Sequence, residues 1–232
     1  RDLRRGNSIL KLCSQKKVMN LFSVLVIVGA TLAVSVSGQR RSAEVGPYTA
    51  QFSGYKYIQR DITNMTTQLL SQSFDFLFLA ADFDRYHRDR PGFEQLYREI
   101  ADQAWSDAIA LLQYQSRRGF PGQLDESYLF RVNDHPRMTD ELGSLQMALG
   151  EEKRVAEMAH AIHQKASVAA EAAKGYDPDA AHFLDRQLIQ RRSGSVRKLT
   201  GYIHIVNGLI NLDTVTRDMG LHLFDHSLKT MQ

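Results

Sequence analysis

Apolar residues recur every three or four positions along four long stretches of the chain, between Tyr57 and about Ile203. Side chains at this spacing share one face of an α-helix, which can then pack against other helices. The first stretch runs roughly from Tyr57 to Phe83 and is rich in aromatic residues. The second begins near Pro91, which is tolerated in a first helical turn, and stops at Gly119, a residue suited to end a helix.

The third stretch begins at Thr139, whose hydroxyl can cap the first turn of a helix. The fourth carries its apolar face on Leu184, Leu188, Val196, Leu199 and Ile203. A shorter apolar segment follows Gly208 and ends near Phe224. Residues 120–137 form the longest stretch without a helical pattern, and a connection of that length can cross a whole bundle. We therefore predict an all-α fold, an up-down four-helix bundle with a long crossover between helices 2 and 3 and a short fifth helix.

The N-terminal residues have the order of a secretory signal. Lys16 and Lys17 precede an uncharged run from Leu21 to Val34, and small residues follow it. The run has about 14 residues, fewer than the ~20 that a membrane-spanning helix needs. Met19 lies just before the run, and we hypothesise that translation starts there. We expect a leader over residues 1–38, with residues 1–18 untranslated and 19–38 a signal peptide, then an N-terminal extension over residues 39–56 and a helical domain over residues 57–232.

The formal net charge of +3 resides in the leader. Residues 1–38 carry six basic side chains and one acidic side chain, which leaves 23 basic and 25 acidic side chains in residues 39–232. A domain so nearly balanced lacks the basic patch of a nucleic-acid-binding protein, and that class is excluded. The single cysteine, Cys13, lies in the leader, so the domain must be stabilised by packing or assembly and not by disulfides.

Several short motifs follow one another at specific spacings. They are Phe83-Asp84-Arg85, Gly92-Phe93, the run from Gln115 to Gly119, Ala148-Leu149 with Glu152-Lys153, Asp177-Pro178 with Phe183-Leu184, and Leu223-Phe224-Asp225. Their order and spacing resemble the ferritin family, colinearly from about residue 57 to residue 228. Together with the predicted signal peptide, the pattern resembles the light chains of secreted insect ferritins.

The resemblance implies a ferritin-like domain over residues 57–232 and a hollow shell of twenty-four subunits. In such a shell ferrous iron enters, is oxidised and is stored as ferric mineral, and this chain would assemble with a heavy-type ferritin partner. The resemblance also implies the secretory pathway, with the shell either secreted into extracellular fluid or retained in the lumen. No membrane attachment is expected once the signal peptide is cleaved.

A di-iron oxidation centre needs several carboxylates and a histidine that converge inside the bundle, because iron in this role binds oxygen and imidazole ligands. The resemblance places these ligand positions on Leu69, Ala104, Asp107, Glu152 and Arg192. Only Glu152 keeps the ligand expected at its position, and leucine and alanine cannot bind iron. We therefore expect a degenerate ferroxidase centre, and a non-catalytic, light-type subunit and not an enzyme.

Two of these charged residues lie on apolar stripes, since Glu152 follows Leu149 by three residues and Arg192 follows Leu188 by four. A buried charge is costly unless it is paired. We hypothesise that Arg192 takes the place of the metal and pairs with Glu152, with Asp107 as a further partner. The alternative is that Asp107 lies at the edge of its stripe and is solvated.

Three further candidate sites lie elsewhere on the helices. Glu99 and Asp102 neighbour each other on the second helix, and the resemblance implies a carboxylate patch there that nucleates ferric mineral; the alternative is an ordinary solvated face. His182 and Asp185 match positions that line the channels through which iron enters ferritins, where a histidine attracts ferrous iron less than an acid would. The alternative is a helix-surface pair. Asn64 begins an N-glycosylation sequon.

Two other functions stay open from the sequence. One is an active ferroxidase subunit, which Leu69, Ala104 and Arg192 disfavour. The other is a secreted helical bundle that carries a small hydrophobic ligand near the aromatic residues 74–79. In a shell, those aromatic residues would instead be buried between subunits. A size measurement separates the two, because a carrier would be a small monomer or dimer.

Overall fold

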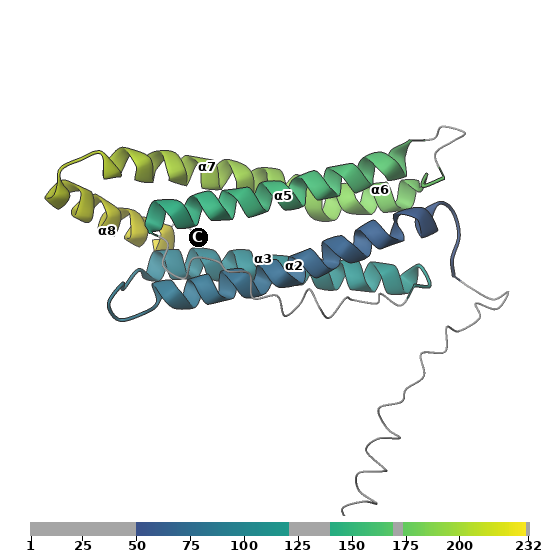
Figure 1. Cartoon of the computed structure of the whole chain (residues 1–232), viewed down its shortest axis with the longest axis horizontal. Coiled ribbons are helices and arrows are strands. Elements are labelled where there is room, and N and C mark those ends of the chain that lie inside the picture. The colour runs from purple at the N-terminus through teal and green to yellow at the C-terminus, as the bar shows by residue number, and fades with distance from the viewer. Residues whose placement is uncertain (1–49, 121–139, 169–173, 231–232) are drawn as a thin grey trace, which may run out of the picture. The chain divides into compact units, whose positions relative to one another are not determined.

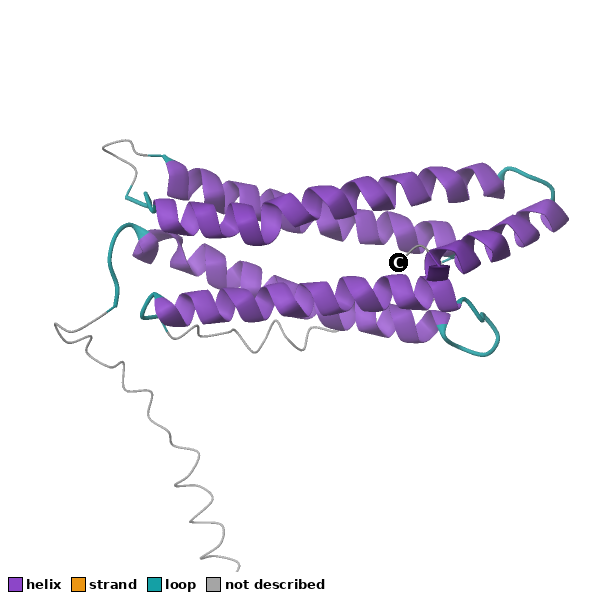
Figure 2. Cartoon of the chain, turned by 180° about the vertical axis from the view of Figure 1, so that it is seen from behind, coloured by secondary structure: helices purple, strands orange, loops and turns teal. Residues whose placement is uncertain are grey.

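The computed structural model describes residues 50–120, 140–168 and 174–230, all within one compact unit, Thr49–Gln232. These residues form helices and no strand (Figures 1 and 2). In chain order the elements are α2 (Tyr55–Phe83), α3 (Pro91–Arg117), α5 (Glu141–Ser167), α6 (Pro178–Leu184), the π-turn η1 (Asp185–Ile189), α7 (Gln190–Ile210) and α8 (Thr214–Thr230). None of the helices in the described ranges is long and apolar enough to cross a membrane.

The long helices are arranged in two layers. α2 packs along α3, and α5 packs along the continuous rod made by α6, η1 and α7 (Figure 1). The two layers face each other, with α2 in contact with α5. The predicted all-α bundle of four long helices with a further helix at its C-terminal end is confirmed. The leader, most of the N-terminal extension and residues 121–139 of the crossover lie outside the described residues.

The starts of α2 and α3 agree with the sequence prediction to within two residues, but the predicted cap of α5 does not. α2 begins two residues before Tyr57, and α3 begins at Pro91 as predicted. Gly119 follows α3 with a φ of +72°, a left-handed conformation that glycine adopts without strain. The cap of α5 is Asp140 and not Thr139, so that prediction was wrong. The Asp140 carboxylate accepts a hydrogen bond of 3.0 Å from the Gly143 N–H, and an acid also complements the positive end of the helix.

The fourth long helix contains a π-turn that the sequence did not predict. η1 joins α6 to α7 without a break. A π-turn adds a residue to one turn and rotates the residues that follow about the helix axis. Leu184, Leu188 and Arg192 are all buried across this turn, so the rod presents a buried face on both sides of it.

α8 closes one end of the bundle against the start of α3. The Asp225 carboxylate accepts a hydrogen bond of 3.0 Å from the Phe93 N–H, an amide that has no partner inside its own helix. Phe224 contacts Phe93 edge-on, with ring centroids 5.8 Å apart. Gly92 is required at this contact, because a Cβ there would lie 1.9 Å from the Asp225 carbonyl oxygen.

Apolar side chains fill the interior as two clusters. One cluster includes Leu69, Val155 and Leu188, and the other includes Phe76, Ala148 and Leu199. Along α2, α5 and the α6–α7 rod, a buried polar residue stands between the two clusters: Gln72, Glu152 and Arg192 respectively. The middle of the bundle is therefore polar, with an apolar cluster on either side of it.

Candidate functional site in the bundle core

A network of buried polar and charged side chains crosses the middle of the bundle, with one member from each of its four long helices. Arg192 of α7 donates a hydrogen bond of 2.8 Å to the Asp107 carboxylate of α3, and another to the Glu152 carboxylate of α5. Gln72 of α2 donates a third, of 3.0 Å, to Glu152 Oε1. All four side chains belong to residues that are at most 2% exposed. The hypothesised pairing is present, and Asp107 is buried and not solvated.

Asp107 has further partners on the outer side of this network. Gln103 Nε2 donates a hydrogen bond of 2.9 Å to Asp107 Oδ1, and Gln187 Nε2 lies 3.5 Å from the same oxygen. The Arg191 guanidinium lies 3.4 Å from it as well, although the Arg191 side chain is 42% exposed. Asp107 is thus contacted on both oxygens, and two arginines face two carboxylates.

Burial and positive charge act in opposite directions on the two acids. Burial is the larger influence, and it raises the pKa of Asp107 and the pKa of Glu152 above their ordinary values. The nearby Arg192 guanidinium lowers both pKa values and offsets part of this effect, and Arg191 acts on Asp107 in the same direction. Without Arg192, two acids would be left buried with no cation between them, which is a costly arrangement.

The charged side chains of this network are paired with one another, which leaves the two carboxylates engaged. The Arg192 guanidinium lies between the two carboxylates that would have to bind iron. Leu69 and Ala104 are fully buried one turn before Gln72 and Asp107, and neither offers a donor atom. Among the residues that the structure describes, no group of three or more His, Cys, Asp or Glu side chains is arranged to hold a metal ion.

The remaining site residues predicted from the sequence lie outside this network. Glu99 and Asp102 are exposed on α3, and Asn64 is exposed on α2. His182 is exposed near the end of α6. Asp185 begins η1, where Gln190 Nε2 donates a hydrogen bond of 3.3 Å to its carboxylate. Their roles stay predictions, because each role depends on iron, a glycan or a neighbouring subunit.

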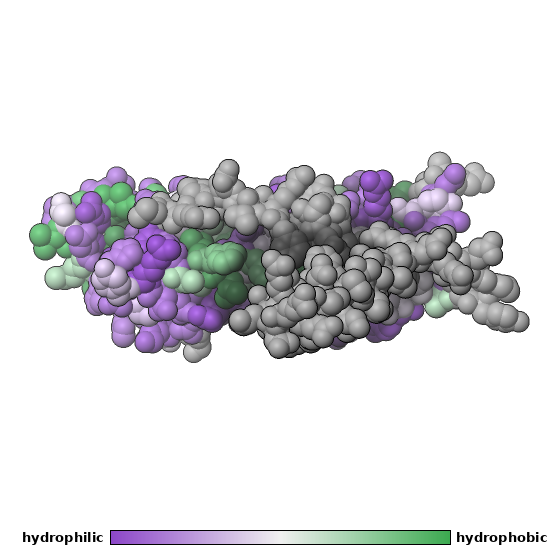
Figure 3. Space-filling model, turned by 60° about the horizontal axis from the view of Figure 1, so that its bottom comes forward, coloured by the Kyte–Doolittle hydropathy of each residue, from purple (hydrophilic) through white to green (hydrophobic). Residues whose placement is uncertain are grey.

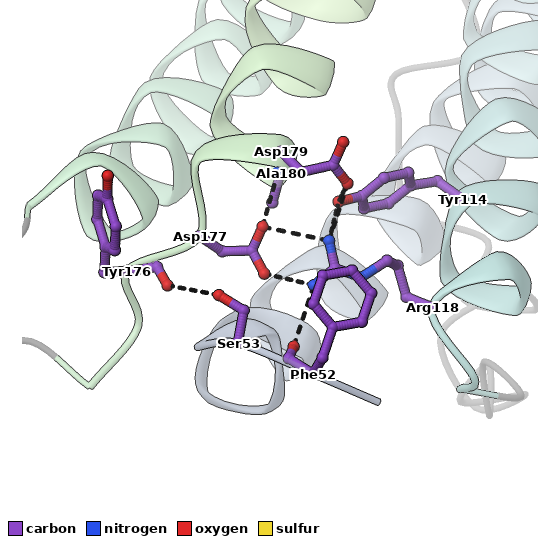
Figure 4. Close-up of polar contacts among 8 residues, drawn as sticks. All are labelled: Phe52, Ser53, Tyr114, Arg118, Tyr176, Asp177, Asp179 and Ala180. Atoms are coloured by element: carbon purple, nitrogen blue, oxygen red, sulfur yellow. Dashed lines mark hydrogen bonds and ion pairs between the residues drawn. The ribbon is translucent and has the colours of Figure 1, made fainter. Parts of the chain in front are cut away.

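A second buried polar cluster, which sequence reasoning missed, joins the C-terminal end of α3 to the start of α6 (Figure 4). Arg118 is 4% exposed and donates hydrogen bonds of 3.2 and 2.5 Å to the two oxygens of Asp177, and one of 2.8 Å to Asp179. Asp177 also caps α6 by accepting a hydrogen bond of 2.9 Å from the Ala180 N–H. A further bond of 3.2 Å from Arg118 to the Phe52 carbonyl oxygen ties down the segment before α2.

Sequence signals for these missed residues are partial. Gln72 lies on the apolar stripe of α2, three residues after Leu69 and four before Phe76, a position that indicates a buried polar residue. Asp177 before a proline is typical of a helix start. Its partner Arg118, however, lies 59 residues away in the sequence, and only the fold brings the two together.

Comparison with known proteins fixes the family. No protein-family model matches the chain. Over 184 residues the chain is 33% identical to the ferritin light chain of Drosophila melanogaster, which covers 78% of this chain and 79% of that protein. The chain belongs to the ferritin family.

Two further ferritins support this assignment. The chain is 28% identical over 163 residues to the ferritin light chain of Trichoplusia ni, covering 69% of this chain and 70% of that protein. The crystal structure of Trichoplusia ni secreted ferritin shares the fold, with a TM-score of 0.71 and 23% identity over 87% of this chain and 97% of that one. This ferritin is therefore an iron-storage subunit similar to insect light chains.

Proposed function

We propose that this ferritin chain is a light-type, non-catalytic subunit of a secreted iron-storage shell. The observation that supports the proposal most directly is the Arg192 guanidinium between Asp107 and Glu152. A di-iron centre needs an open interior position at which carboxylates can bridge two metal ions. Here a fixed cation engages the same carboxylates, and Leu69 and Ala104 supply no ligand. The subunit would then depend on a heavy-type ferritin partner for iron oxidation.

Mineral nucleation is the role that we assign to the exposed acids of α3. Glu99 and Asp102 lie one turn apart on α3, and both are exposed. Two such carboxylates can hold ferric ions close together and so lower the barrier to the first mineral. We assign His182 and Asp185 to a channel for ferrous iron between neighbouring subunits.

Exposed apolar side chains on two faces suit the assembly of a shell. Four large apolar residues of α2 and α3 are between 41% and 71% exposed: Phe74, Leu77, Phe78 and Trp105. In Figure 3, the coloured part of the visible face shows a group of hydrophobic side chains among hydrophilic ones. On α8, three residues at four-residue spacing are exposed: Val215, Met219 and Leu223. Such apolar patches are typical of protein contacts, and we propose that neighbouring subunits of a twenty-four-subunit shell cover both faces.

Secretion is the remaining part of the proposal. Residues 19–38 would act as the signal peptide, and the likeness to a secreted insect ferritin supports this. Asn64 is exposed on α2, as an acceptor of an N-linked glycan must be.

Initial rates of ferrous oxidation test the proposal. Shells assembled from residues 39–232 alone should oxidise ferrous iron at close to the protein-free rate, and shells that include a heavy-type subunit should be faster. The double variant Glu99→Gln/Asp102→Asn should lengthen the lag before mineral grows, whereas Glu157→Gln, which removes an exposed acid from α5, should not. A fast, saturable rate from this chain alone would instead identify an active ferroxidase subunit.

A further inference from the structure

A cavity of about 340 Å³ lies between the C-terminal end of α3 and the α6–η1 segment. Part of its wall is a stacked pair of aromatic rings, Tyr114 and Phe183, with centroids 4.2 Å apart. The polar part of the wall consists of Arg117, Arg118, Asp179, His182, Arg186 and Gln187. Three arginines therefore line this cavity beside a single carboxylate.

The carboxylate and one of the arginines are already engaged. Arg118 forms ion pairs with Asp177 and Asp179. Asp179 also accepts a hydrogen bond of 2.8 Å from the Tyr114 hydroxyl, on the same oxygen that Arg118 contacts. The acid in the wall is thus held by Arg118 and Tyr114, and it does not neutralise the other arginines.

Arg117 and Arg186 carry the unmatched positive charge of the cavity. Both are exposed, and neither has a carboxylate partner among the described residues. The Arg117 guanidinium lies over the Tyr114 ring, 6.0 Å from its centroid. Arg117 ends α3 and Arg186 belongs to η1, so the fold brings together two cations that are far apart in the sequence. A π-turn such as η1 is often found at a functional site.

This wall suits an anion better than a metal ion. A divalent cation needs several oxygen or imidazole ligands, and here the acid is engaged while two guanidinium groups repel positive charge. An oxyanion, by contrast, can accept charge-assisted hydrogen bonds from both guanidinium groups. The planar fork of arginine matches the paired oxygens of a phosphate or a carboxylate.

We propose that this cavity binds a small multivalent oxyanion, such as inorganic phosphate or a tricarboxylate, through Arg117 and Arg186. Arg117 and Arg186 are not part of the buried Arg192 network, which the cavity meets only through Gln187 among its lining residues. Anion binding does not depend on whether the subunit oxidises iron, so the proposal goes beyond the light-type function.

Calorimetric titration of the iron-free, assembled protein with inorganic phosphate, and separately with citrate, tests the proposal. At low ionic strength we expect saturable binding of at least one of the two anions. Arg117→Gln and Arg186→Gln should each weaken that binding by about tenfold or more, because each removes a charge-assisted hydrogen bond. The matched control is Arg197→Gln, which removes an exposed arginine of α7 that does not line the cavity.

The two arms of the titration distinguish the sources of the anion. Binding of phosphate alone identifies a tetrahedral anion, and binding of citrate alone identifies a polycarboxylate. The absence of saturable binding for both anions would overturn the proposal. An equal loss of affinity in Arg197→Gln and Arg186→Gln would also overturn it, because the binding would then reflect diffuse surface charge. Since no iron is present, failure here leaves the light-type assignment standing, and fast ferrous oxidation would leave this site standing.

Discussion

Replacement of Arg192 by glutamine should destabilise this ferritin bundle by about 3–5 kcal/mol, the cost of removing one partner from a buried ion pair. The variant leaves Asp107 and Glu152 buried without the cation that lies between them. Glutamine keeps an amide donor, so the main change is the loss of charge. Arg191 cannot replace the lost charge, because it is 42% exposed and contacts Asp107 only at 3.4 Å.

The destabilisation by Arg192→Gln should grow as pH rises. Burial raises the pKa of Asp107 and of Glu152, and loss of Arg192 removes a group that lowers both. A raised pKa means that the folded state holds these protons more tightly than the unfolded state does. The contribution to stability is then fully present below the ordinary pKa values and is lost as pH rises through the folded values. The gap between variant and wild type should therefore be smaller in acid than at neutral pH.

Scanning calorimetry of assembled shells, with size exclusion at each pH, measures this effect. For a domain of this size the loss corresponds to a melting temperature lower by roughly 6–20 °C. The control Arg197→Gln removes an exposed charge of the same helix and should change stability by about 0.5 kcal/mol or less. The triple variant Asp107→Asn/Glu152→Gln/Arg192→Gln should recover much of the loss, because no buried charge remains. An Arg192→Gln variant as stable as the control would refute the reasoning.

Three other substitutions test the packing. Arg118→Gln should lower the free energy of unfolding by about 3 kcal/mol, because it leaves Asp177 buried without its cation. Arg118→Lys keeps the charge and should lower it less, and thermal unfolding measures both. Gly201→Ala should raise stability by about 0.5–1 kcal/mol, because an added Cβ meets nothing within 4 Å; blocked assembly would show instead that another subunit covers this face. Gly92→Ala should loosen α8, measured as faster amide exchange there, because its Cβ would lie 1.9 Å from the Asp225 carbonyl oxygen; unchanged exchange would contradict the close contact.

The helices could be predicted from the sequence, because apolar residues at helical spacing lie on the face that is buried. The start of α3 also followed from the sequence, since Pro91 fits only the first turn of a helix. The start of α5 did not, because Thr139 and Asp140 are both good caps and local chemistry alone does not choose between neighbours. The π-turn η1 left no sequence signal, because its apolar residues also fit an ordinary helical stripe.

The core network could be predicted in part. Glu152 and Arg192 interrupt apolar stripes, and a charge at such a position demands a partner of opposite sign. Gln72 occupies an equivalent position, but an uncharged amide needs no partner of opposite charge, so its bond to Glu152 could not be predicted. The contact between Arg118 and Asp177 could not be predicted, because it depends on how α3 meets α6.

Arginine side chains line the cavity and also belong to the core network, and this bears on where iron could approach the subunit. Arg117 and Arg186 stand at the cavity, and Gln187, which also lines the cavity, lies 3.5 Å from Asp107. Arg191 and Arg192 then meet Asp107 itself. Two unit charges 4 Å apart interact by about 1 kcal/mol in water and about 4 kcal/mol near a protein surface, and a divalent ion doubles these values. Arg117 and Arg186 would therefore repel ferrous iron at the cavity, and we expect iron to meet this subunit at its exposed carboxylates instead.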